Sequence, residues 1–180
     1  MLRRLLVFTD AVDWLTEQIG QWLKWLVLFS SLISAFNALM RYTIHYSSNA
    51  WLEIQWYMFG AMFLLGAGYA LKYDEHVRVD VLFSKMTPKQ QAWLDVFGGI
   101  FFLMPMAVII GWLSIPMVIN SFRIWEHSND PGGLLRWPIK IVIPIGFALL
   151  AIQGVAEIIK KYAIATGVRE PGKAYERPVQ

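Results

Sequence analysis

The chain has 180 residues, of which 57% are hydrophobic and only 16% are charged. Soluble proteins average about 45–50% apolar and about 25% charged residues, so this composition excludes an ordinary soluble domain. The net charge of +3 is small, and the absence of cysteine excludes disulfides, thiolate metal sites and cysteine nucleophiles.

Four windows are long and apolar enough to cross a lipid bilayer, which takes roughly 20 mostly apolar residues. They cover about residues 22–42, 54–71, 96–119 and 138–159. The sequence therefore predicts an all-α membrane protein whose four-helix transmembrane domain occupies residues 22–162.

The two ends of the chain differ from these windows. Residues 1–21 interleave apolar and acidic side chains at helical spacing, which is typical of an amphipathic helix lying in the headgroup region. An extension of the first span outside the bilayer is the alternative. Asp10 and Asp13 interrupt the apolar stretch that a signal peptide needs, so cleavage is not expected. Residues 163–180 are polar, contain two prolines and predict a flexible tail.

The placement of basic residues predicts the orientation of the chain. Of the 16 Lys and Arg, 12 lie in the two termini and in the loop after the second span, and four lie near the other two loops. Cytoplasmic segments of membrane proteins carry the excess of Lys and Arg, so both termini are expected in the cytoplasm.

The interiors of the four windows carry no Asp, Glu, Lys, Arg or His. A chain that moves ions by itself usually needs ionisable groups within the bilayer, so any translocation path is expected in a partner. His45, His76 and His127 lie in or near loops, where a bis-histidine haem is not expected. No nucleophile turn or glycine-rich phosphate loop is recognisable, and the sequence predicts no enzyme, catalytic residue, cofactor or metal site.

Arg41 and Glu53 lie at the two ends of the short connection between the first and second spans. An Arg side chain can bind a carboxylate through two parallel hydrogen bonds, so this pair would lock the connection or bind a partner. Two separately solvated interface charges are the alternative. The charged segment 74–80 could likewise dock a second protein on the cytoplasmic face, or could form a plain solvated loop near anionic headgroups.

Several motifs follow one another in a fixed order. The first half contains Asn37-x-x-x-Arg41, Trp51-x-Glu53, a glycine-rich second span and His76-Val77-Arg78-Val79-Asp80. The second half contains Glu126-x-Ser128-x-Asp130-Pro131-Gly132-Gly133-Leu134, Trp137-Pro138-Ile139-Lys140, Pro144-x-Gly146-Phe147 and Gln153-Gly154.

Over residues 20–162 this order resembles the small membrane subunit (the Q subunit, DctQ-like) of tripartite ATP-independent periplasmic (TRAP) transporters. The second half resembles the branch labelled mannitol/chloroaromatic-compound transport. The chain departs from the expected pattern at Ile54, where the family would carry a second acidic residue beside Glu53. This departure argues against a role that needs paired carboxylates.

The resemblance implies a division of labour between three proteins in a bacterial inner membrane and its periplasm. A periplasmic binding protein captures an organic acid, a large multi-span permease carries it inward with sodium, and the small subunit enlarges the fixed scaffold. Gly66, Ala70, Trp112 and Asn120 would then face protein rather than lipid, and the third loop would help receive the binding protein. The candidate structural and partner-contact residues are Asn37, Arg41, Trp51, Glu53, Gly66, Ala70, His76, Arg78, Asp80, Trp112, Asn120, Glu126 and Asp130.

Two other functions remain alternatives at this point. The chain could be the membrane anchor of a redox enzyme complex, or a stand-alone four-helix exporter in which Glu53 would be the acidic group.

Overall fold

The computed structural model describes residues 2–75 and 86–168, and the fold over these residues is helical. The elements in chain order are α1 (Leu2–Thr43), α2 (Asn49–Lys72), α4 (Pro88–Gly98), the π-helical turn η1 (Gly99–Leu103), α5 (Met104–Arg123) and α6 (Trp137–Ala165). Helix α1, helix α2, the continuous unit α4–η1–α5 and helix α6 are each long and apolar enough to cross a membrane. This confirms the prediction of an all-α protein with four membrane-spanning helices.

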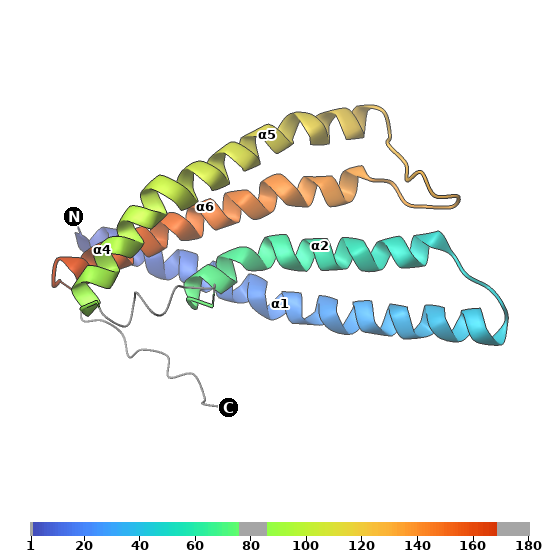
Figure 1. The fold of residues 1–180 in the computed structure, drawn as a ribbon, viewed down its shortest axis with the longest axis horizontal. Helices are drawn as coiled ribbons and strands as arrows, with labels where there is room; N and C mark the ends of the chain where they lie inside the picture. The colour runs from blue at the N-terminus through green and yellow to red at the C-terminus, as the bar shows by residue number, and fades with distance from the viewer. Residues whose placement is uncertain (1, 76–85, 169–180) are drawn as a thin grey trace.

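The helices form an elongated bundle in which α1 packs on α2, α2 on α6, and α6 on α5 (Figure 1). The N-terminal half of α1, the C-terminal ends of α2 and α6, and α4 lie at one end of the bundle, here called the termini end. The connections 44–48 and 124–136 lie at the opposite end, here called the loop end. This arrangement brings residues far apart in the sequence together at both ends.

Helix α1 is 42 residues long, or ~63 Å at 1.5 Å per residue, about twice the ~30 Å thickness of a bilayer core. The helix continues without a break through residues 21 and 22, where the sequence analysis expected a boundary between an N-terminal amphipathic segment and the first span. Instead of facing outward together, Asp13 and Thr16 bond to side chains of α6.

The third spanning unit begins where the sequence provides a helix start. The Thr87 side chain accepts a hydrogen bond from the Gln90 amide, the Gln90 side chain accepts one from the Thr87 amide, and Pro88 is the first helical residue. Further along, Pro105 has no amide hydrogen and its ring would clash with the carbonyl of residue 101 in a regular α-helix. The turn just before it widens into η1, in which the Met104 amide bonds to the Gly99 carbonyl.

Helices α2 and α6 approach each other closely at Gly146. A Cβ atom on Gly146 would lie only 2.8 Å from the Leu64 carbonyl oxygen, so the two backbones meet where the side chain is absent. Gly66 and Ala70, which were expected to face protein, line a groove of about 960 Å³. Residues of α2 line one side of this groove, residues of α4, η1 and α5 line the other, and α6 contributes to its wall.

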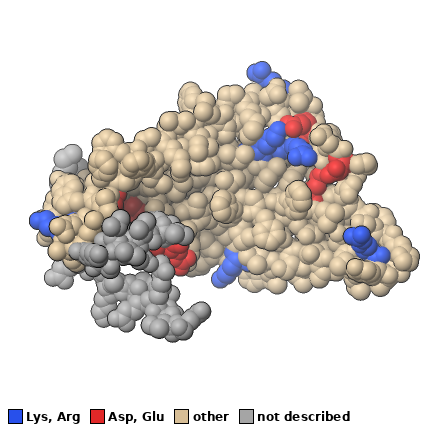
Figure 2. Space-filling model, in the orientation of Figure 1, with Lys and Arg blue, Asp and Glu red and all other residues tan. Residues whose placement is uncertain are grey.

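Large apolar side chains cover the outer surface of the bundle. Trp56, Phe63 and Trp112 are 76%, 81% and 72% exposed. Charged side chains are few on the face in Figure 2. Such a surface is stable against lipid or against another membrane protein, while small and polar residues fill the contacts between helices.

Candidate functional site: polar clusters at the two ends of the bundle

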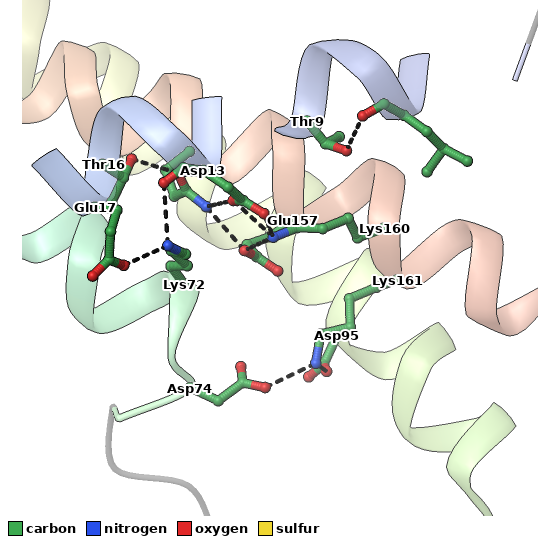
Figure 3. A network of polar contacts seen from close by, with 12 residues as sticks. Thr9, Asp13, Thr16, Glu17, Lys72, Asp74, Asp95, Glu157, Lys160 and Lys161 are labelled. Atoms are coloured by element: carbon green, nitrogen blue, oxygen red, sulfur yellow. Dashed lines mark hydrogen bonds and ion pairs between the residues drawn. The ribbon is translucent and has the colours of Figure 1, made fainter. Parts of the chain in front are cut away.

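The termini end contains a network of charged and polar side chains from α1, α2, α4 and α6 (Figure 3), here called the termini cluster. Its members are Asp13, Thr16, Glu17, Lys72, Tyr73, Asp74, Asp95, Gln153, Glu157, Lys160 and Lys161. Opposite charges that are withdrawn from water attract strongly, so this network holds the helices together at one end.

Lys160 lies at the centre of the termini cluster. Its ammonium group is 2.9 Å from each Asp13 carboxylate oxygen and 2.5 Å from a Glu157 oxygen. Gln153 is fully buried, and its amide donates to both carboxylates at 2.9 and 3.0 Å. The Thr16 hydroxyl donates to the Gln153 carbonyl oxygen at 2.6 Å. Every polar atom of the Gln153 side chain is therefore bonded, and α1 is fixed to α6.

Two further lysines extend the cluster to α2 and α4. The Lys72 ammonium lies 2.7 Å from a Glu17 oxygen, which also accepts the Tyr73 hydroxyl at 2.5 Å. The hydrogen bond to Glu17 raises the pKa of the Tyr73 hydroxyl above its ordinary value. Lys161 lies 3.0 Å from Asp74 and 3.0 Å from Asp95, so α6 connects the turn after α2 with α4.

The loop end contains a second set of polar contacts, here called the loop cluster, formed by Asn49, Glu53, Tyr57, Glu126, Ser128, Arg136 and Lys140 with the backbone of residues 124–136. Glu53 is only 8% exposed. Its carboxylate accepts hydrogen bonds from the Ser128 hydroxyl and from the Leu134 amide, the latter at 2.6 Å. Arg136 donates to the Ser128 hydroxyl oxygen at 3.2 Å and adds a positive charge near the carboxylate.

Glu126 and Lys140 close the base of the same loop. The Lys140 ammonium donates to the Glu126 carboxylate, and this ion pair connects the segment just after α5 to the first turn of α6. The hydrogen bond from Lys140 lowers the pKa of the Glu126 carboxyl below its ordinary value.

The expected pairing of Arg41 with Glu53 is wrong in this structure. Arg41 is exposed at the last turn of α1, whereas Glu53 is buried against the connection between α5 and α6. The reason is geometric. The N-terminal turn of α2 faces the later connection, whose amide and hydroxyl groups satisfy the carboxylate.

The other predicted residues are dispersed over the molecule. Trp51 packs against Phe36 with ring centroids 5.4 Å apart, and Asn37 is half-buried on α1. Trp112, Asn120 and Asp130 are exposed, on α5 and at the tip of the loop after it. His76, Arg78 and Asp80 lie outside the described residues.

Sequence reasoning missed most of the termini cluster, because Asp13 and Glu17 were interpreted as groups facing lipid headgroups or solvent. A usable signal was present on α6. Gln153, Glu157 and Lys160 or Lys161 recur every three to four residues, so they share one helix face, and Asp13, Thr16 and Glu17 do the same on α1. Two such complementary stripes at similar depth predict a contact between the helices.

Neither cluster resembles a catalytic or metal centre. In the described part of the chain, no group of three His, Asp or Glu residues is placed to hold a metal ion. His45 and His127 are both exposed at the loop end, and His127 contacts the Trp125 carbonyl at 2.8 Å. The fold and its polar ends define a multi-pass membrane protein whose polar groups fix helices and a loop.

Comparison with known proteins places this chain within a family. Residues 30–163 match the family described as tripartite ATP-independent periplasmic transporters, DctQ component. The chain is also 30% identical over 106 residues to the "Putative TRAP transporter small permease protein" of Haemophilus influenzae. That match covers 58% of this chain and 65% of the relative, just under two thirds of its length. None of the solved structures compared matches the chain.

Because the family match covers most of the chain, the protein belongs to the DctQ-component family of TRAP transporters. This family is a transporter component, which confirms the prediction that the chain is not an enzyme. The redox-anchor and stand-alone-exporter alternatives are therefore set aside.

Proposed function

We propose that this chain is the small scaffold subunit of a TRAP transporter that imports an organic acid together with sodium. In this proposal a large multi-span permease carries the substrate and the sodium, and a periplasmic binding protein delivers the substrate. The family match supports the assignment to a TRAP transporter. The mannitol/chloroaromatic branch, suggested by the motifs of the second half, is part of the proposal.

The observation that carries the scaffold role is the distribution of polar groups. The stretches 25–40, 54–71, 96–122 and 141–156 contain no Asp, Glu, Lys, Arg or His. Charged contacts hold the helices to one another at the termini end and hold the connection 124–136 at the loop end. A bundle fixed at both ends with an apolar middle is suited to supporting a moving partner, and it offers no ionisable relay for an ion.

The proposed orientation places the termini end in the cytoplasm and the loop end in the periplasm of a bacterium, with the inner membrane between them. The excess of Lys and Arg at the termini and in the loop after α2 supports this orientation. The loop cluster then faces the compartment of the binding protein, and the third loop is available to receive it.

The test is to isolate the tagged chain from its native membrane in mild detergent and to identify its partners by mass spectrometry. A stoichiometric large multi-span permease is expected. The pair is then placed in lipid vesicles, where uptake of an organic acid should require both the binding protein and an inward sodium gradient. A homodimer without a partner overturns the proposal, and uptake that is unaffected by removing sodium overturns the coupling.

A further inference from the structure

Three side chains of α2 contact the connection between α5 and α6, and they do so from one face of the helix. Asn49, Glu53 and Tyr57 follow one another at intervals of four residues, which places them in a single stripe. The Asn49 amide donates to the Pro131 carbonyl at 3.0 Å, and the Tyr57 hydroxyl donates to the Leu135 carbonyl at 3.0 Å. Between them, the Glu53 carboxylate accepts a hydrogen bond from the Leu134 amide. The stripe therefore binds mainly backbone groups.

The connection itself, residues 124–136, closes as a small hairpin. The Ser128 amide donates to the Leu134 carbonyl at 2.9 Å, and the Arg136 amide donates to the Glu126 carbonyl at 2.8 Å. An isolated antiparallel bridge pairs His127 with Leu135. These few bonds do not make a regular β-sheet, and a short two-stranded hairpin is only marginally stable by itself in water. The α2 stripe supplies the missing support.

Gly133 shows how tightly the hairpin fits on the stripe. A Cβ atom there would lie 2.8 Å from a Glu53 carboxylate oxygen and 2.5 Å from the Ser128 Cβ. By contrast, His127, Asn129 and Asp130 have exposed side chains. The backbone of the hairpin is thus fixed from the α2 side, while the side chains of its tip remain available to another protein.

We propose that Asn49, Glu53 and Tyr57 are positioning residues that preset hairpin 124–136 for docking by the periplasmic binding protein. This inference rests on the proposed function, since it assigns a partner and a mechanism to the loop end. Ordering a flexible loop during binding costs conformational entropy and weakens the affinity. A loop that is already ordered avoids this cost. If only a fraction of the hairpins has the shape that the binding protein recognises, the apparent affinity equals the intrinsic affinity multiplied by that fraction.

The experiment measures uptake in vesicles that contain the complete small and large subunits, at increasing concentrations of the binding protein. For Glu53→Leu, the half-saturating concentration of binding protein is expected to rise roughly tenfold, as the competent fraction falls. The maximal rate at saturating binding protein and the yield of the two-subunit complex should change less than twofold. Glu53→Gln should lie between this variant and the wild type, because an amide oxygen still accepts a hydrogen bond but carries no charge.

Gln55→Leu is the matched control. Gln55 lies on the same helix, and its side chain donates to the Trp51 carbonyl of its own helix at 3.0 Å. The Gln55→Leu variant also replaces a polar side chain by Leu, but it removes no bond to the hairpin. Its half-saturating concentration of binding protein should therefore equal that of the wild type. A nitroxide on Asn129→Cys reports the mobility of the hairpin, and the label is unique within this chain because the chain has no cysteine.

The proposal is overturned if the nitroxide shows a loosened hairpin in Glu53→Leu while the half-saturating concentration stays at the wild-type value. The proposal is also overturned if the nitroxide is equally immobile in the wild type and in Glu53→Leu. Should Glu53→Leu fail to insert, Asn49→Ala and Tyr57→Phe remove one hydrogen bond each and must show the same direction of change. If wild-type vesicles show no uptake that depends on the binding protein, the proposed function itself fails, which is a separate result.

Discussion

The two ends of the bundle use polar groups in different ways. At the termini end, side chains bond to side chains: Lys160 contacts Asp13 and Glu157, and Lys161 connects Asp74 with Asp95. At the loop end, helix side chains bond largely to the backbone of a hairpin, as Asn49 and Tyr57 do. The first arrangement fixes helices to one another, and the second fixes the shape of a loop. Substitutions at the termini end should therefore affect the whole bundle, and substitutions at the loop end should act locally.

The largest effect on the stability of the chain is expected from Lys160→Met. Lys160 is the shared partner of two carboxylates, and its side chain is only 14% exposed. Its removal leaves Asp13 and Glu157 uncompensated, which costs about 3 kcal/mol of unfolding free energy. Equilibrium unfolding in mixed detergent measures the loss.

Lys89→Met is the control for Lys160→Met, because Lys89 is exposed in the first turn of α4. Combining Lys160→Met with Asp13→Asn should recover part of the loss, since one unpaired charge is removed. Equal stability of Lys160→Met and Lys89→Met would show that the termini cluster does not hold the bundle together.

An intermediate, local effect is expected from Gly133→Ala. The added methyl group would collide with Glu53 and Ser128, and overpacking of this kind typically costs about 1–3 kcal/mol. Hydrogen exchange should increase at the Leu134 amide and remain unchanged in α6. Gly98→Ala is the matched control, since a Cβ atom at Gly98 has no neighbour within 4 Å. Uniformly increased exchange over the whole bundle would contradict the local role of the loop cluster.

A smaller effect is expected on acidification. The pKa of Glu126 is lowered in the folded protein by its hydrogen bond with Lys140, from an ordinary value of 4.5. A carboxyl of this kind contributes stability above its unfolded pKa, and that contribution disappears as the pH falls through the folded pKa. The hairpin should therefore be equally ordered at pH 7 and pH 6 and should loosen below about pH 4.5.

The nitroxide on Asn129→Cys measures this loosening. Other carboxylates also titrate in acid, so the informative quantity is the difference between the wild type and Glu126→Gln. That difference should be present at neutral pH and vanish at low pH. A difference that grows on acidification would refute the assignment.

The smallest effect on the isolated chain is expected from Trp112→Ala, in the apolar middle between the two ends. Trp112 is 72% exposed, so truncating it removes little packing and should leave the unfolding free energy within about 0.5 kcal/mol. Its effect should lie in the complex: the yield of co-purified large subunit should fall, because exposed Trp residues are common anchors of interfaces.

Trp56→Ala is the comparison for Trp112→Ala, because Trp56 is equally exposed at 76% on α2. If the two variants retain the large subunit equally well, Trp112 is not an anchor of the partner. If both lose it, the partner covers both α2 and α5.

The sequence alone determined the four spanning helices, since a long run of apolar residues has few stable forms other than a membrane helix. The helix start at Thr87 and Pro88 is likewise a local feature, because the capping box joins residues three positions apart. Both features rest on interactions between near neighbours in the chain.

The partners of the charged groups, by contrast, depend on how the helices pack. Asp13 and Lys160 are 147 residues apart, and Glu53 and Leu134 are 81 apart, so local spacing can indicate a polar helix face but does not select the individual pairs. Arg41 illustrates the limit: it lies closer in sequence to Glu53 than Ser128 does, yet Glu53 bonds to Ser128. A charged side chain near a span end can face solvent, lipid headgroups or another helix, and the packing angles of the helices select among these.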